Sequence, residues 1–193
     1  MQPNLRCSSP LPRAEEAALK FNVVIAYEDF KSGKHARRTC DLLAETLGNS
    51  CRFSSQMWKF EILSIPKLRE MAVHDAGLAD VIIVSCRGSN ELPTDVKTWI
   101  ELWLGEKREA LALVALFDSP TEDSHQADMI RDFLAQVARR GQMEFFAQPY
   151  EWPGKGLGEP RHSTRATSPW EEETLSTLSI VVQQEVSAPR WGQ

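Results

Sequence analysis

The sequence has little of what marks secreted, membrane-spanning or zinc-binding proteins. Its four cysteines, Cys7, Cys40, Cys51 and Cys86, show neither CxxC nor CxxH spacing, which disfavours a zinc site or a disulfide framework. The first 20 residues contain no apolar segment of the kind that a secretory signal needs, and the longest apolar runs, such as 110–117, are too short to cross a membrane. We therefore expect free thiols and a cytoplasmic protein.

An excess of basic charge is also missing. The 193 residues contain 22 Lys and Arg against 27 Asp and Glu, a formal net charge of -5 at pH 7. Broad binding to nucleic acid or to an anionic membrane needs a basic surface, so we predict neither. The length suits one domain with additional terminal segments.

Signatures of catalysis and nucleotide binding are absent as well. The chain has no GxGxxG and no Walker A motif, the glycine-rich loops that bind dinucleotides and triphosphates. Its histidines, His35, His74, His125 and His162, form no pair at metal-ligand spacing. We expect a surface position for each of them.

What the sequence does contain is a regular alternation of apolar, β-branched runs with amphipathic segments. The run at 80–85 is apolar on both faces, which is typical of the middle of a parallel sheet. The segment 51–65 is the least regular, and we expect its strand to include the apolar residues Met57, Trp58, Phe60, Ile62 and Leu63. The predicted strands are 21–27, one within 51–65, 80–85, 111–117 and 143–147, and the predicted helices are 35–47, 67–78, 93–105 and 123–140.

Strands that alternate with helices through short connections must run parallel, with right-handed crossovers. The predicted fold is an α/β, three-layer α/β/α sandwich over residues 21–150, with a five-stranded parallel sheet in the order 2-1-3-4-5. Residues 1–20 indicate a flexible N-terminal arm and 151–193 a largely irregular C-terminal tail. Within that tail a short helix is expected over 170–186.

Two loops should border the ligand site, because such sheets bind ligands at the carboxyl ends of the strands, where the strand order switches. The first is 28–34, whose Ser-Gly-Lys segment at 32–34 could offer backbone N–H groups to a phosphate. Glu28 and Asp29 oppose that interpretation, since carboxylates beside a phosphate are unfavourable unless a cation screens them. A solvated acidic loop is the simpler alternative. Paired acids after the first strand hold Mg²⁺ in receiver domains, but Ser85-Cys86 replaces the Asp expected after the third strand, which disfavours receiver phosphorylation.

The second loop is 86–92. Cys86 at its start could be a nucleophile if Arg87 lowers the pKa of the thiol. No histidine lies near it in the sequence, and an inert buried thiol is the commoner case. Gly88 and Asn90 suit a tight turn.

The segment 79–104 resembles the corresponding part of the flavodoxin-like NADPH-dependent FMN reductases and quinone reductases. In these enzymes an Ala-Asp strand is followed by a ring-contacting loop, a proline and an amphipathic helix with an apolar-acid-Trp sequence. Residues 27–35 are similar to the phosphate loop of flavodoxins, with Ser32-Gly33-Lys34-His35 as the counterpart. The matching positions are Ala79-Asp80, Asn90, Pro93, Val96-Lys97 and Ile100-Glu101, with Trp103 one step late.

This resemblance implies FMN as cofactor and an NAD(P)H-dependent oxidoreductase, in which the flavin carries hydride or single electrons. Ser32, Gly33, Lys34 and His35 would hold the phosphate. Arg87, Gly88, Ser89 and Asn90 would border the isoalloxazine ring. A small-molecule or flavin ligand and a homodimer are the partners that this interpretation predicts.

Two alternatives stay open. The chain departs from the family at the ring-contacting loop, where Arg-Gly-Ser replaces an aromatic residue, and at Glu28-Asp29. It is therefore also consistent with a cofactor-free, flavodoxin-like or receiver-like module that binds a partner protein or a small anion. Trp99 and Trp103 could belong to such an interface, but their helical spacing is explained by inward packing alone. A third interpretation uses Glu28, Asp29 and Asp118 as metal ligands or acid–base groups of a hydrolase or glycosidic transferase, although no partnered base completes the set.

Overall fold

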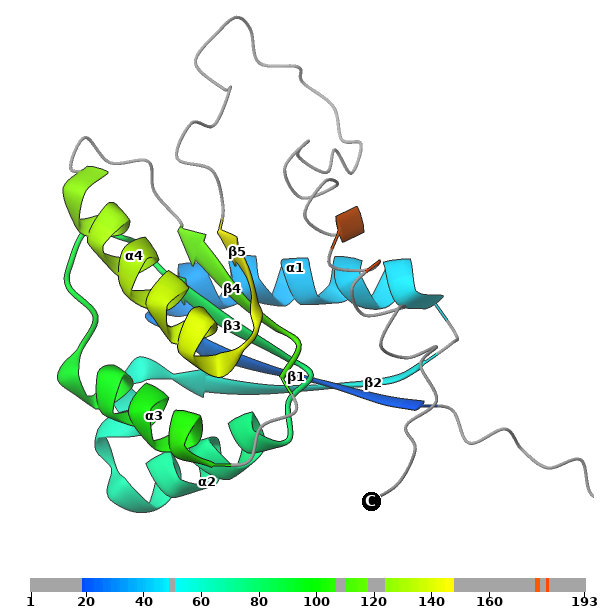
Figure 1. The fold of residues 1–193 in the computed structure, drawn as a ribbon, viewed down its shortest axis with the longest axis horizontal. Coiled ribbons are helices and arrows are strands. Elements are labelled where there is room, and N and C mark those ends of the chain that lie inside the picture. Colours follow the sequence, from blue (N-terminus) through cyan, green and yellow to red (C-terminus); the bar gives the residue numbers. More distant parts are fainter. Residues whose placement is uncertain are drawn as a thin grey trace, which may run out of the picture.

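The computed structural model describes residues 19–48, 51–106, 110–117 and 124–147, together with Ser176, Thr177 and Ile180. Five parallel strands form one sheet in the order β2-β1-β3-β4-β5, flanked by helices (Figure 1). The predicted three-layer α/β/α sandwich and its strand order are therefore confirmed. The strands are β1 (Leu19–Tyr27), β2 (Cys51–Lys59), β3 (Val81–Cys86), β4 (Ala112–Phe117) and β5 (Glu144–Ala147); the helices are α1 (Phe30–Leu47), the 3-10 helix η2 (Phe60–Ser64), α2 (Pro66–Gly77), α3 (Thr94–Gly105) and α4 (Ser124–Gly141).

The helices divide between the two faces of the sheet. Helix α1 covers one face, and α2, α3 and α4 cover the other (Figure 1). Strand β3 lies in the centre and is buried along its whole length. Its side chains alternate between the faces: Val81 and Ile83 point to α1, and Ile82 and Val84 to the other three helices. Burial on both faces is what a continuous apolar strand requires.

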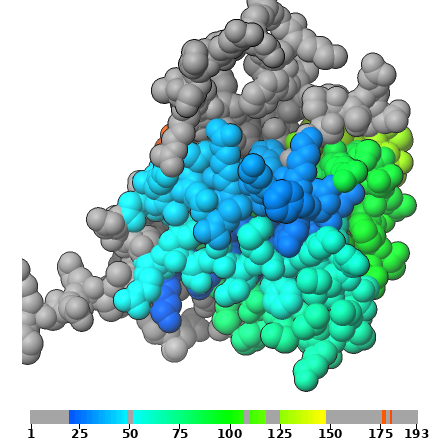
Figure 2. All heavy atoms as spheres, turned by 180° about the vertical axis from the view of Figure 1, so that it is seen from behind, coloured from blue at the N-terminus to red at the C-terminus, as the bar shows by residue number. Residues whose placement is uncertain are grey.

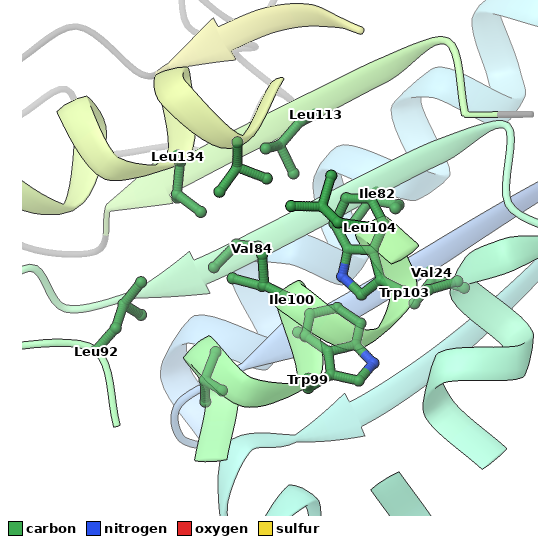
Figure 3. Packing of buried hydrophobic residues seen from close by; sticks show 14 of the residues in the cluster. Val24, Ile82, Val84, Leu92, Trp99, Ile100, Trp103, Leu104, Leu113 and Leu134 are labelled. Carbon is green, nitrogen blue, oxygen red and sulfur yellow. The ribbon is translucent and has the colours of Figure 1, made fainter. Parts of the chain in front are cut away.

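The largest buried side chains lie under α3 (Figure 3). Val96, Trp99, Ile100 and Trp103 recur at helical spacing, and the structure buries all four completely. The two indole rings are tilted against each other, with their centroids 6.1 Å apart. The inward packing expected for these tryptophans is therefore observed.

Helix α1 corrects the sequence prediction. It begins at Phe30 and not at residue 35, so the predicted loop 28–34 shrinks to Glu28 and Asp29. The cause is a reciprocal capping interaction between Asp29 and Ser32, which satisfies backbone N–H groups that a helix start leaves without partners. Gly33 indicated a loop in the sequence, but the cap at Asp29, four residues earlier, overrides a single glycine.

The segment after β2 is a second correction. Strand β2 ends at Lys59, and Phe60, Ile62 and Leu63 belong to η2 and not to the strand. Phe60 and Leu63 are the buried pair, three residues apart, which is the repeat of a 3-10 turn. A strand would have placed these two side chains on opposite faces.

The other predicted elements are observed with small shifts of their ends. Strand β1 begins at Leu19, so the last two residues of the predicted arm 1–20 belong to the sheet. Within the helix expected over 170–186, Ser176, Thr177 and Ile180 are helical, and the other residues of both predicted terminal segments lie outside the described part of the chain. Among the described residues, no helix combines the length and the apolar character that a membrane span demands.

Candidate functional site

The carboxyl ends of β1 and β3 meet in the middle of the sheet, where the strand order switches. Tyr27 and Ser85 are the last paired residues of these two strands, and the Glu28 backbone N–H donates to the Ser85 carbonyl at 3.0 Å. The turn Glu28–Asp29 therefore lies beside the start of the loop that leaves β3. The two loops predicted from the sequence are in contact.

Asp29 is the N-cap of α1 and occupies the amino end of that helix with its own carboxylate. Its Oδ1 accepts from the Ser32 backbone N–H at 3.0 Å, and the Ser32 Oγ accepts from the Asp29 N–H at 2.9 Å. The Ser32 hydroxyl in turn donates to the Asp29 carbonyl. A negative charge at this place is favoured by the helix dipole, and here the chain supplies it.

Arg87 joins the second loop to this cap. Its guanidinium pairs with the Asp29 carboxylate, and its backbone N–H donates to Glu28 Oε2 at 2.7 Å. The hydrogen bond from the Ser32 backbone, followed by the bond and charge of Arg87, keeps the pKa of Asp29 below the usual value of an aspartate, although desolvation acts in the opposite direction. The carboxylate is thus held in its charged form.

The four residues of the predicted phosphate loop do not converge on one point. Ser32 and Gly33 are buried, whereas Lys34 is exposed and His35 is partly exposed. The Ser32 carbonyl accepts from the Ser85 hydroxyl at 3.0 Å, and a Cβ on Gly33 would lie 2.7 Å from the Tyr27 ring. The glycine therefore lets the helix approach Tyr27, and the serine is used by the cap and by β3.

This arrangement fits an FMN phosphate poorly. The amino end of α1 carries the Asp29 carboxylate where the phosphate would lie, and two anions would repel each other there. The Arg87 guanidinium, which could otherwise bind a phosphate, is already paired with that carboxylate. FMN binding stays a prediction that titration can test.

The predicted ring-contacting loop is shaped by packing. Gly88 is buried with a φ of +78°, and a Cβ there would lie 3.1 Å from both Ala127 and Phe117. Ser89 is partly exposed and Asn90 is exposed. Glycine is required at position 88 by both its backbone conformation and its neighbours.

The two described thiols are structural. Cys86 is only 3% exposed and belongs to the core between the sheet and α2–α4, so its side chain does not face solvent as a nucleophile would. Burial raises the pKa of the Cys40 thiol to about 11. The side chains of Cys7 and Cys51 lie outside the described part of the chain.

Three residues that the sequence did not single out complete this edge of the sheet. Lys59 ends β2 and forms an ion pair with Glu61 at 2.7 Å. Glu61 is the main reason why the pKa of Lys59 is raised. Lys59 pairs in register with Tyr27, so it lies at the same edge of the sheet as the turn that follows β1. Phe30, the first residue of α1, is 84% exposed. Neither position could be read from the sequence, because Lys59 lay inside the predicted strand and nothing in the sequence indicated the exposure of Phe30.

We call Glu28, Asp29, Lys59, Glu61 and Arg87 the carboxyl-edge cluster. It contains three acids and two bases, and every one of them has a hydrogen bond or an ion pair within the cluster. In the described ranges no three His, Cys, Asp or Glu side chains are grouped so that they could hold a metal ion, and Asp118 lies outside those ranges.

Several residues behind the FMN-reductase resemblance have structural roles in this fold. Asp80 is buried, and its Oδ2 accepts from the Asn22 backbone N–H at 2.7 Å, which ties the start of β3 to β1. Lys97 pairs with Glu91, and Glu101 forms a bidentate pair with Arg140 of α4. These residues serve the scaffold and contact no common site.

No known protein family matches the chain, and no curated protein is significantly similar to it in sequence.

Proposed function

We propose that this chain is a cofactor-free, flavodoxin-like module that binds a partner protein at the carboxyl edge of its sheet. The observation that carries the proposal is the pairing of Asp29 with Arg87. It fills the amino end of α1 with a carboxylate of the chain and joins the two loops between which the fold would otherwise bind a ligand. The notion of an FMN-dependent NAD(P)H oxidoreductase is the competing hypothesis.

The chemistry of this edge is that of a protein interface. Phe30 projects with 84% of its surface exposed, next to the capped turn of Asp29. The charges around it have both signs and are paired with one another. An aromatic anchor within a mixed polar surround is how protein interfaces are commonly built.

Flavin titration separates the two hypotheses. We expect that adding the purified full chain to FMN leaves the flavin fluorescence unchanged, because Asp29 repels the phosphate. The variant Lys34→Glu should behave like the wild type, as should Lys67→Glu on α2, which serves as a charge-matched control. Saturable FMN binding that Lys34→Glu weakens and Lys67→Glu does not would support the oxidoreductase and overturn our proposal.

Photo-crosslinking tests the partner site directly. Replacing Phe30 with the photoreactive benzoylphenylalanine keeps an aromatic ring at the edge, and irradiation in the host cell should yield a discrete adduct with another protein. The control carries the same group at Leu78, which is 55% exposed at the end of α2 that precedes β3, on the opposite edge of the sheet. The same pattern from both positions, or no adduct at position 30, would contradict the proposal.

A further inference from the structure

The two outer strands of the sheet differ in how they are protected. Strand β5 has four residues, and a short edge strand offers little for another strand to pair with. Strand β2 has nine residues and pairs continuously with β1, from Leu19↔Cys51 to Tyr27↔Lys59, without a bulge. Among the described residues, no strand pairs with β2 on its other side. Within the described part of the chain, its outer N–H and C=O groups therefore form a long row without a partner strand.

Strand β2 also lacks the residues that usually block edge pairing. Its sequence, CRFSSQMWK, has no proline or glycine, and its charges are confined to Arg52 and Lys59 near the two ends. The middle is neutral and polar, with Ser54 and Gln56 exposed. In Figure 2 the atoms of β2 are visible at the surface, between those of α1 and those of α2.

We propose that β2 pairs with β2 of a second copy in antiparallel orientation, which makes one continuous sheet across a homodimer. The sequence of β2 is complementary to itself about Ser55. With Ser55 opposite Ser55 of the second copy, all nine residues are paired, and like charges are never opposed. The resulting pairs are Cys51 with Lys59, Arg52 with Trp58, Phe53 with Met57 and Ser54 with Gln56, each occurring twice.

The side chains on each face support this register. On the α1 face, Phe53 and Met57 are both partly buried and apolar, so they would extend the core layer across the dimer. The Phe53 ring is already held against Phe21 with their centroids 5.7 Å apart. On the other face, Arg52 would lie over the ring of Trp58, whose indole N–H is fixed by a hydrogen bond to Asp75 at 3.1 Å.

Charges next to the two-fold axis are also balanced. Arg37 of α1 donates to the Ser55 hydroxyl at 3.4 Å and pairs with Asp41 at 2.9 Å. The axis through Ser55 would bring the Arg37–Asp41 pairs of the two copies together. Because each copy contributes one cation and one anion there, the pairs can exchange partners without net repulsion.

A shift of register makes the fit worse. Moving the strands by two residues in one direction places Phe53 opposite Ser55, and in the other direction it places Phe53 opposite Lys59. Both shifts also leave residues at the strand ends unpaired. A shift by one residue would bring side chains of different faces together, with Phe53 opposite Gln56 in one direction and Arg52 opposite Lys59 in the other.

Analytical ultracentrifugation of the full chain tests the proposal with two variants at exposed positions. The wild type should sediment as a dimer, at twice the 21.8 kDa of one chain. The double variant S54K/Q56K places lysine opposite lysine at two sites, and we expect about a tenfold weaker dimer. The matched variant S54E/Q56K places glutamate opposite lysine at the same two sites and should dimerise at least as tightly as the wild type.

Three results would overturn the proposal. The first is a wild type that sediments as a single chain at every concentration reached. The second is a dimer that S54K/Q56K does not weaken, since the copies then associate through another surface. The third is a dimer that S54E/Q56K weakens as much as S54K/Q56K does, because the two residues are then not opposite each other. Circular dichroism of both variants checks that the fold is kept. These outcomes are independent of the crosslinking at Phe30, which lies at a different edge of the sheet.

Discussion

Helix α3 and the carboxyl-edge cluster are both attached to β3, and different forces hold them. Under α3 the contacts are apolar: Trp99 and Trp103 are completely buried against the sheet and the neighbouring helices. In the carboxyl-edge cluster the contacts are hydrogen bonds and ion pairs, with Arg87 bridging to Asp29 and Glu28 at the surface. Apolar burial stabilises in proportion to the area removed from water, whereas exposed ion pairs contribute little. The comparison teaches that α3 stabilises the fold and that the cluster chiefly fixes the geometry of two loops.

The largest effect is expected from removing a ring under α3. Trp103→Ala should lower the free energy of unfolding by about 3–5 kcal/mol, because it leaves a cavity among fully buried side chains. Leu102→Ala is the matched control, since the adjacent Leu102 is 46% exposed. Urea denaturation measures both. If the two variants lose the same amount, the apolar layer under α3 is not what anchors this helix.

The next effect is expected at Gly33, where the helix start touches the first strand. Gly33→Ala places a methyl group 2.7 Å from the Tyr27 ring and should cost about 1–3 kcal/mol of stability. Gly105→Ala, in the last turn of α3 with no atom within 4 Å of the added Cβ, should be neutral or stabilising. Combining Gly33→Ala with Tyr27→Ala should recover part of the loss. Equal behaviour of the two glycine variants would place Gly33 in an open loop.

A smaller effect is expected at the cap. Asp29→Ala should cost about 1 kcal/mol at neutral pH, and Asp29→Asn less, because asparagine also caps helices. The pKa of Asp29 is lower in the folded than in the unfolded chain. The charged carboxylate therefore stabilises the fold fully at a pH above the unfolded pKa, and this contribution is lost as the pH falls through the folded pKa. The difference between the wild type and Asp29→Asn should therefore begin to shrink at about pH 4, the ordinary pKa of an aspartate, and disappear only once the pH lies below the lowered pKa of folded Asp29. A difference that grows on acidification would contradict the assignment.

The smallest effect is expected from an ion pair at the edge of the same loop. Lys97 and Glu91 pair at the surface, with Glu91 mostly exposed. Lys97→Met should leave the urea midpoint unchanged within error, because solvent and salt screen such a pair. If Lys97→Met lowers the free energy of unfolding as much as Asp29→Ala does, exposed ion pairs stabilise these loops more than we infer from comparing them with α3.

The sequence predicted the fold well where a pattern repeats. The continuous apolar run of β3 and the spacing of Val96, Trp99, Ile100 and Trp103 on α3 have one structural solution each, since periodicity reports which faces must be buried. The sequence predicted less well where a local signal was ambiguous. Phe60 and Leu63 fit either a strand or a 3-10 turn in a short window, and the packing against α2 and α3 decided for the turn.

The candidate site divides in the same way. The predicted strand order implied that the loops after β1 and β3 lie together, because neighbouring parallel strands end at the same edge of the sheet. The sequence did not predict the pair between Asp29 and Arg87. These residues are 58 positions apart, and nothing in either segment indicates the other as its partner. The sequence by itself determined a parallel α/β sandwich and which helix faces are buried, because burial of apolar area depends on composition and period. Only the tertiary structure decided that Arg87 bridges to the Asp29 cap and that Phe60 and Leu63 form a 3-10 turn, because both depend on which residues the fold brings next to each other.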